Sequence, residues 1–242
     1  MAGKRAKILS IADLGDVLVY ATCTRHPVRN KVIVLLSAKA GLRAGEIANL
    51  TWDMVVDANG QISGLIELAD GATKKCSGRS IPIHSDLAAA LVAWPQIARS
   101  SDYVVASERN RQMRPLSIVV WFNRAFKNIG LKGCSSHSGR RTFVTRAARI
   151  VHKAGGSLRD VQLLAGHRSI QTTQRYIDGD SDAQRKLVAH DLRRHGRDDH
   201  HSASSNQPKK SPQNCQTIRG ANRLRCPDHS YGLRSCRVGN MD

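Results

Sequence analysis

Apolar positions repeat along most of the chain with the three- and four-residue spacing of amphipathic helices. Ser10 can cap a first helix, which Pro27 ends. The apolar face of this helix is expected to be Ile11, Leu14, Val17 and Leu18. A second helix then runs to Gly41, a natural residue for a helix C-terminus. Its apolar side is Val28, Val32, Ile33, Leu35 and Leu36. Residues 42–50 predict a turn that enters a third helix.

Between Met54 and Ile83 the pattern changes to the alternation that is typical of strands. Residues 62–68 and 79–83 are the expected strands. Polar turns are expected over 57–60 and 71–78. We therefore predict a small antiparallel sheet of two or three strands.

Helical spacing returns after the second strand. Ser85 or Asp86 can cap a helix that extends through Ala98, with a kink at Pro95. A short extended segment follows over 103–105. The next helix is expected to start at Ser117 and to carry Ile118, Val119, Trp121, Phe122, Phe126 and Ile129.

The last part of the pattern predicts four more helical segments. One spans His137 to His152, with Phe143, Val144, Ala147, Ala148 and Ile150 facing inward. Ser157 and Asp160 have capping-box spacing before a short helix. Further helices are expected over 170–177 and from 181 to about 195. The fold class is therefore mainly α with a small antiparallel β-sheet (α+β).

Three regions follow from this pattern. Residues 1–9 form a basic lead-in, residues 10–195 form the folded domain, and residues 196–242 lack an apolar period and are expected to be disordered.

The charge of the chain indicates its partner. Its 242 residues carry a formal net charge of +19, which favours a polyanion, and nucleic acid fits best. No apolar run approaches the ~20 residues of a membrane span. The six cysteines form no CxxC pair, so reduced thiols in a cytoplasmic protein are expected.

Two arginines, two histidines, a lysine and a tyrosine are candidates for metal-free cleavage of a phosphodiester. A tyrosine can attack phosphorus and leave a covalent link. The planar fork of arginine can hold the nonbridging oxygens, and lysine can protonate the leaving oxygen. The candidates are Arg43, Lys74, His137, Arg140, His167 and Tyr176.

The stretches around these residues resemble the tyrosine recombinases of the phage integrase family. Gly41–Trp52 resembles their first arginine box, and His137–Arg140 resembles their His-x-x-Arg box. Ala165–His167 followed by Thr172–Tyr176 resembles the third box, and Lys74 stands eight residues before Pro82, where the hairpin lysine is expected. The boxes also occur in the family's order, between about residues 10 and 194.

The resemblance implies the catalytic domain shared by tyrosine recombinases and type IB topoisomerases, and it implies roles for the six residues. Arg43 and Arg140 would clamp the scissile phosphate, with His167 donating to a phosphate oxygen. Lys74 would be the acid for the 5′-oxygen, and His137 would assist proton transfer. Tyr176 would form a 3′-phosphotyrosyl intermediate. No cofactor or metal is implied.

Several neighbouring residues have competing interpretations. Lys75 is the alternative to Lys74, because both lie in the same turn. Glu46 is interpreted as structural, orienting an arginine. Arg79 and Arg141 are interpreted as phosphate contacts or surface charge. The tail cysteines do not fit the spacing of a usual zinc site.

The expected function is site-specific recombination or integration on double-stranded DNA, with a homo-oligomer, a tetramer by resemblance, and no membrane. The alternatives are a type IB topoisomerase-like strand-passage enzyme and a recombinase derivative that only binds DNA. The separate N-terminal DNA-binding domain of most family members is expected to be absent. The alternatives are a compact variant, a contact supplied by another protein, or a truncated gene. The tail over 196–242 is expected to be either extra DNA-binding chain or the product of a shifted reading frame.

Overall fold

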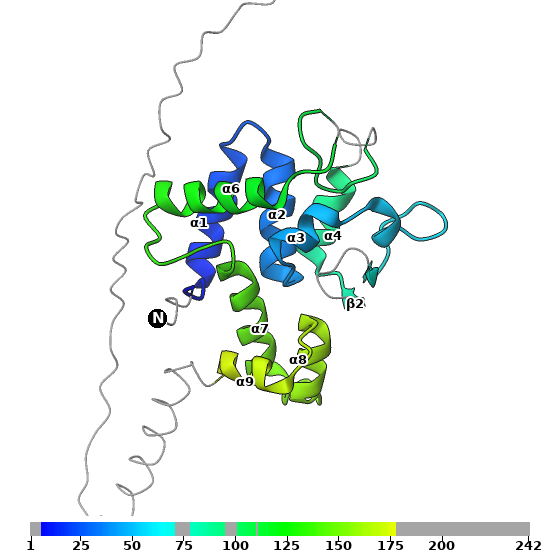
Figure 1. The fold of residues 1–242 in the computed structure, drawn as a ribbon, viewed down its shortest axis with the longest axis vertical. Coiled ribbons are helices and arrows are strands. Elements are labelled where there is room, and N and C mark those ends of the chain that lie inside the picture. Colours follow the sequence, from blue (N-terminus) through cyan, green and yellow to red (C-terminus); the bar gives the residue numbers. More distant parts are fainter. Residues whose placement is uncertain (1–5, 71–77, 95–100, 110, 178–242) are drawn as a thin grey trace, which may run out of the picture. The chain divides into compact units, whose positions relative to one another are not determined.

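The structure is a computed structural model and describes residues 6–70, 78–94, 101–109 and 111–177. Its elements in chain order are α1 (Ile11–Thr22), α2 (Pro27–Lys39), α3 (Ala44–Asn49), the 3-10 helix η1 (Trp52–Met54), β1 (Leu65–Leu68), β2 (Arg79–Pro82), α4 (Ser85–Ala93), α6 (Pro115–Asn128), α7 (Ser138–Ile150), α8 (Leu158–Ala165) and α9 (Ile170–Ile177). The described part is mainly helical with one small antiparallel sheet, which confirms the predicted fold class (Figure 1).

Some sequence predictions fall outside the described residues. These are Lys74 with its turn, the kink at Pro95, the helix from 181 to about 195, and the tail over 196–242.

The first helix begins as the sequence predicts. The Ser10 hydroxyl accepts a hydrogen bond from the Asp13 N–H at 3.0 Å, and the Asp13 carboxylate accepts one from the Ser10 N–H at 2.8 Å. This capping box satisfies backbone groups that have no partner inside the helix. The predicted apolar face is wrong at one position, because Ile11 lies in the first turn and is 83% exposed.

The second helix ends in a close approach between distant parts of the chain. Pro27 is its first residue, where a missing N–H costs nothing. Gly41 follows its end with a φ of 68°, in the left-handed region that favours glycine. A Cβ at this position would lie 2.3 Å from the Phe143 ring. The chain can therefore turn tightly against α7 and enter α3 beside it.

The two strands pair antiparallel, with Leu65 opposite Pro82 and Leu68 opposite Arg79. Ile66 and Ile81 are partners and are fully buried, so one face of the sheet lies on the core. The first strand is shorter than predicted, since Ile62 pairs with Val56 in an isolated bridge instead.

Three other predictions about helices need correction. The cap of α4 is His84 and not Ser85 or Asp86, because the Nδ1 of His84 accepts the Asp86 N–H at 3.1 Å. Helix α6 starts at Pro115, two residues before the expected Ser117, since proline suits the first position of a helix. Ile150 does not face inward, because it lies at the last turn of α7 and is 59% exposed.

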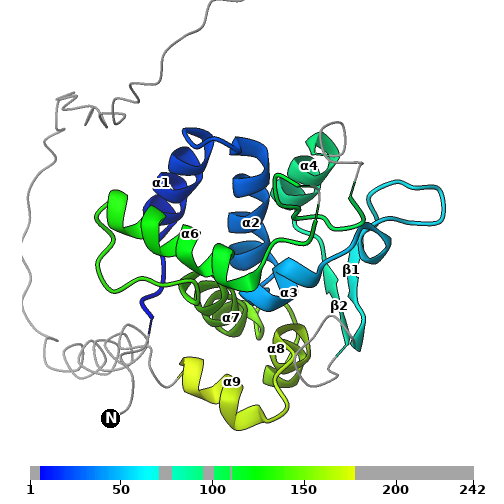
Figure 2. The same cartoon turned by 45° about the horizontal axis from the view of Figure 1, so that its top comes forward.

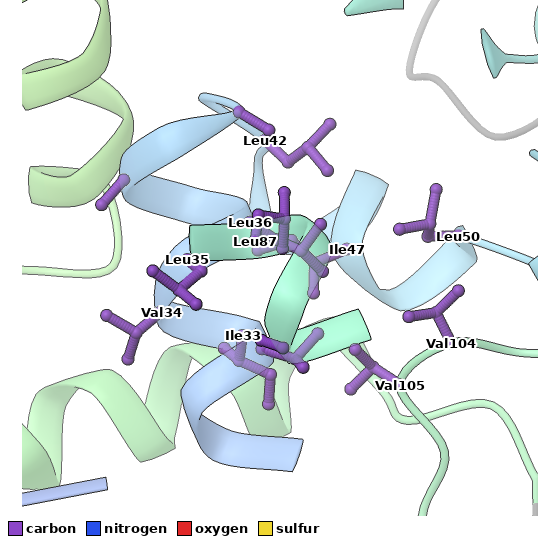
Figure 3. Packing of buried hydrophobic residues seen from close by; sticks show 14 of the residues in the cluster. Ile33, Val34, Leu35, Leu36, Leu42, Ile47, Leu50, Leu87, Val104 and Val105 are labelled. Carbon is purple, nitrogen blue, oxygen red and sulfur yellow. The ribbon is translucent and has the colours of Figure 1, made fainter. Parts of the chain in front are cut away.

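Two separate groups of apolar side chains are buried. The larger one, called the main core, joins α1, α2, α3, α4, α6 and the sheet. In Figure 3 its side chains from α2, α3 and α4 point toward one another around Leu36, Ile47 and Leu87. The smaller one, called the α7–α8 cluster, consists of Val144, Ala148, Val151, Val161 and Ala165.

Helix α2 connects the main core to the elements that follow it. It contacts α1, α4 and α7 (Figure 2). Its approach to α7 depends on Gly139, because a Cβ there would lie 2.3 Å from the hydroxyl of Ser37. Helices α8 and α9 pack on α7 and on each other, and α8 also contacts β2.

The segment before α1 is held by α7 and by the loop that precedes it. The Lys7 N–H donates to the Gly133 carbonyl at 3.1 Å, and the Leu9 N–H donates to the Thr142 hydroxyl at 2.8 Å.

Within the described ranges, no helix is long and apolar enough to cross a bilayer.

Candidate active site

A pocket of about 540 Å³ brings together five of the six predicted catalytic residues. They come from the start of α3, the start of α7, the turn after α8, and α9. The five residues are Arg43, His137, Arg140, His167 and Tyr176. The rest of the lining is Ala6, Ser135, Arg141, Thr172 and Arg175. Lys74, the sixth predicted residue, lies outside the described residues.

Arg140 is the most deeply buried of the pocket arginines, with 3% of its surface exposed. Its Nη1 donates to the Gly41 carbonyl and its Nη2 to the Ala165 carbonyl. Burial and the charge of Arg43 lower the pKa of Arg140 to about 10, so the guanidinium stays charged at neutral pH. The carbonyls of Gly41 and Ala165, which belong to separate segments, thus fix the buried guanidinium of Arg140 beside the pocket.

Arg43 reaches the same pocket from the N-cap position of α3. Its Nη1 donates to the Oε1 of Glu46 at 2.6 Å, and its backbone N–H donates to the Oε2 of Glu46 at 2.9 Å. The side chain of Arg43 is 36% exposed, whereas that of Glu46 is 2% exposed. Glu46 therefore anchors an arginine whose guanidinium remains open to a ligand.

Glu46 also binds a second arginine, Arg79, at the start of β2. The Nη1 of Arg79 donates to Oε1 at 3.2 Å and its Nη2 donates to Oε2 at 3.0 Å. Burial alone would raise the pKa of Glu46, but the hydrogen bonds and charges of Arg79 and Arg43 outweigh it and lower the pKa to about 2. The carboxylate is therefore ionised at neutral pH.

His167 follows a left-handed turn that ends α8. Gly166 has a φ of 59° there, and the Nε2 of Gln162 donates to the His167 carbonyl at 2.8 Å. The Nδ1 of His167 lies 3.0 Å from the hydroxyl of Thr173. Burial, and next the charges of Arg140, Arg43 and Arg79, lower the pKa of His167 to about 4. The imidazole is therefore neutral at neutral pH.

Tyr176 lies next to His167, although nine residues separate them. Their rings stack with centroids 5.3 Å apart and an interplanar angle of 21°. Tyr176 also packs against the α7–α8 cluster, so α9 holds its ring at the pocket. His137, the residue before α7, is exposed and lines the same pocket.

Arg79 is not a surface charge, because its side chain is 6% exposed and forms an ion pair with Glu46. The alternative of a phosphate contact stays a prediction. Arg141 lines the pocket, and its Nη1 donates to the Ala6 carbonyl at 3.1 Å.

The orienting role expected for Glu46 agrees with its bonds to Arg43. Its spacing of three residues from Arg43 was the signal in the sequence. No comparable signal links Glu46 with Arg79, which is 33 residues further along.

Within the described parts of the chain, no cluster of His, Cys, Asp or Glu side chains could hold a metal ion. The donors around the pocket are instead guanidinium, imidazole and phenol groups. Such groups bind and protonate anionic oxygen atoms. The arrangement therefore suits a phosphate ester.

Comparisons with known proteins agree with this chemistry. The sequence profile of the phage integrase family matches residues 15–183. Tyrosine recombinase XerA of Thermococcus kodakarensis is 34% identical over 154 residues, which cover 61% of this chain and 50% of XerA. Tyrosine recombinase XerC of Alcanivorax borkumensis is 28% identical over 185 residues, which cover 72% of this chain and 57% of XerC. The chain thus spans about half the length of the curated relatives it matches.

Solved structures show the same fold. A crystal structure of XerA recombinase aligns with a TM-score of 0.61 and 24% identity, over 76% of this chain and 64% of that one. A lambda integrase tetramer bound to a Holliday junction aligns with a TM-score of 0.58 and 19% identity, over 73% of this chain and 49% of that one.

Proposed function

Because this chain belongs to the phage integrase family, we propose that it is a tyrosine-type site-specific recombinase, which cleaves and rejoins DNA through a 3′-phosphotyrosyl intermediate. The observation that carries the proposal is the gathering of Arg43, His137, Arg140, His167 and Tyr176 around one pocket. The net charge of +19 suits a DNA partner.

The covalent step begins at Tyr176. Its phenolic oxygen attacks the scissile phosphorus, a bond forms between them, and the bond from phosphorus to the 5′-oxygen breaks. Lys74 supplies the proton that the departing 5′-oxygen takes up. His137, at the exposed start of α7, assists transfer of the proton that the phenol loses. A 5′-hydroxyl of a partner strand then attacks the phosphotyrosine and releases Tyr176.

Arg43 and Arg140 stabilise the charge that develops on the nonbridging oxygens. Arg140 is fixed by two backbone carbonyls and Arg43 by Glu46, so neither guanidinium has to reorganise during the reaction. Preorganised donors of this kind each contribute about 10²–10³ in rate. Arg43 precedes α3 and Arg140 lies in α7, so the two arginines meet only in the folded chain.

His167 acts as a neutral donor. The Thr173 hydroxyl, which is fully buried, can donate to Nδ1 of His167. The proton of the neutral ring then resides on Nε2, where it can be donated to a phosphate oxygen. The depressed pKa keeps the ring in this state at neutral pH.

The working unit includes several copies of the chain on double-stranded DNA. The tetramer of lambda integrase on a Holliday junction supports an assembly of four, because strand exchange needs more than one active site. A cytoplasmic location belongs to the same proposal.

The first prediction concerns the nucleophile. The test uses nicked DNA duplexes whose sequence around the nick is randomised. Cleavage close to the nick releases a short fragment that diffuses away, so the enzyme cannot religate the strand. The wild-type chain should form an adduct that survives denaturation, and Tyr176→Phe should form none, because only the hydroxyl can attack. Denaturing gels of labelled DNA measure the adduct.

Tyr20→Phe is the matched control and should form the adduct at the wild-type level. The Tyr20 hydroxyl accepts a hydrogen bond from Asn128 at 2.7 Å, between α1 and α6, and the described lining of the pocket does not include Tyr20. Adducts that persist in Tyr176→Phe would refute the assigned nucleophile. DNA binding without any adduct from the wild type would favour a protein that only binds DNA. Adducts without exchanged strands would favour the topoisomerase-like activity.

A further inference from the structure

Arg79 is a buried cation to which the reaction described above gives no role. The described residues that line the pocket do not include it, and its side chain is 6% exposed. Besides its two bonds to Glu46, its Nε donates to the Leu164 carbonyl at 3.0 Å. All three nitrogens of the buried guanidinium thus donate a hydrogen bond. These acceptors are needed because a buried charge without partners would be costly.

Glu46 is the shared acceptor of the arginine cluster. Arg43 and Arg79 are hydrogen-bonded to it, and the Nη1 of Arg140 lies 4.0 Å from its Oε2. Three positive charges and one negative charge leave a net charge of +2. A phosphodiester carries one negative charge, and a second develops on its nonbridging oxygens in the transition state. The net positive charge of the cluster is therefore opposite in sign to the charge that develops in the transition state.

Removing Arg79 would change this balance in two ways. The net charge of the cluster would fall to +1, and both oxygens of Glu46 would lose a donor. The carboxylate would then attract Arg43 and Arg140 more strongly, because a buried anion needs compensation. Both guanidinium groups would have less of their charge available for the phosphate.

Arg79 also touches the turn that precedes His167. A Cβ on Gly166 would lie 2.6 Å from the Nη1 of Arg79, so the guanidinium packs directly against this glycine. The same side chain thus contacts the element that anchors Arg43 and the turn that leads to His167.

We propose that Arg79 is a positioning residue, which neutralises and holds Glu46 so that Arg43 and Arg140 direct their charge at the scissile phosphate. This inference rests on the proposed function. The simpler role would be purely structural, with Arg79 only fastening β2 to α8 through the Leu164 carbonyl.

The experiment measures single-turnover cleavage and equilibrium binding on the nicked duplexes that form adducts with the wild type. Arg79→Gln should lower the cleavage rate by about 10² while the affinity for the duplex changes less than about threefold, since the surface charge stays in place. Glu46→Gln removes the anion that Arg79 compensates. In the double variant Arg79→Gln with Glu46→Gln, the rate should therefore recover at least about tenfold relative to Arg79→Gln.

Arg29→Gln is the matched control, because Arg29 is a partly buried arginine of α2 that donates to the Ala106 carbonyl at 3.3 Å. It should leave the rate of the folded protein unchanged. Urea unfolding of each variant gives the folded fraction to which rates are normalised. If Arg79→Gln does not fold, Arg79→Lys and the double variant take its place. Arg79→Lys keeps the positive charge, so its cleavage rate should fall by less than the factor of about 10² expected for Arg79→Gln.

If the wild type cleaves and Arg79→Gln cleaves at the same rate, the inference about Arg79 is overturned while the proposed function stands. A loss that Glu46→Gln does not relieve, or that affects affinity as much as rate, would assign Arg79 the purely structural role. Absence of a Tyr176-dependent adduct from the wild type would instead overturn the proposed function, and the inference with it.

Discussion

The main core and the region of α7–α9 are stabilised in different ways. The main core buries long aliphatic side chains such as Ile33, Leu35 and Leu36. The α7–α8 cluster consists only of valines and alanines. Among the described residues, most of the buried polar side chains belong to this second region, namely Ser138, Arg140, Thr142, Thr145, Gln162, His167 and Thr173. The α7–α9 region therefore buries many hydrogen-bonding side chains, and its Arg140 is held by two backbone carbonyls.

The difference has a physical reason. A phosphate site needs fixed charge, and a fixed charge must be partly buried and compensated by specific partners. Arg140 of α7, between two carbonyls, is such an arrangement. Glu46 of α3, between two arginines, is another, and it lies next to the main-core residue Ile47. The main core supplies the stability that these groups do not, because burial of apolar surface is the dominant favourable contribution to folding.

The largest expected effect is on the main core. Leu36→Ala should lower the free energy of unfolding by about 2–5 kcal/mol, because Leu36 is fully buried and the change leaves a cavity. Urea denaturation measures this loss. Leu163→Ala on α8 is the matched change in the other region, and it should cost much less since Leu163 is 54% exposed. Equal losses would contradict the assignment of the core.

Sequence patterns located helices in both regions. Helical spacing located α1, α2, α7 and α9, because a buried stripe repeats locally along the chain. It was wrong for Ile11 and Ile150, which lie at helix ends where the stripe meets solvent. A repeat pattern does not reveal which turn of a helix the neighbouring elements cover.

The candidate site was predicted through its ordered boxes, and five of those residues line one pocket. The partners that hold them were harder to predict. Arg140 is held by the carbonyls of Gly41 and Ala165, and any residue has a carbonyl, so the sequence contains no sign of the contact. Arg79 looked like one of many surface cations in a chain with 38 Lys and Arg residues. The role of Lys74 stays a prediction.

The second expected effect is a selective acid sensitivity of the α7–α9 region. In the folded protein the pKa of His167 is lowered from 6.5 to about 4, so an unfolded chain takes up this proton at a higher pH than the folded one. Stability should therefore be complete above pH 6.5 and fall as the pH drops toward 4, by about 3 kcal/mol at ~1.4 kcal/mol per pKa unit. Glu46, with its pKa lowered from 4.5 to about 2, adds a loss of the same sign at lower pH.

Urea unfolding at a series of pH values measures this slope, and hydrogen exchange locates it. His167→Gln should flatten the dependence between pH 6.5 and 4, whereas His152→Gln, at an exposed position after α7, should keep it. Amides of α8 and α9 should lose protection before those of α2 as the pH falls. Equal loss of amide protection in α2 and in α8 and α9 would contradict the selective acid sensitivity of the α7–α9 region.

The smallest expected effect compares two helix starts that share the same spacing of serine and aspartate. Ser10 and Asp13 begin α1 in the main core, and Ser157 and Asp160 begin α8 beside the pocket, with the Asp160 carboxylate accepting from the Ser157 N–H at 2.7 Å. Ser10→Ala and Ser157→Ala should each destabilise the protein by about 1 kcal/mol. Only Ser157→Ala should also slow cleavage, by up to about fivefold, because α8 ends in the turn that presents His167. Thermal unfolding and single-turnover cleavage of both variants test this. A slower rate in Ser10→Ala as well would mean that the two regions are coupled more tightly than their separate cores indicate.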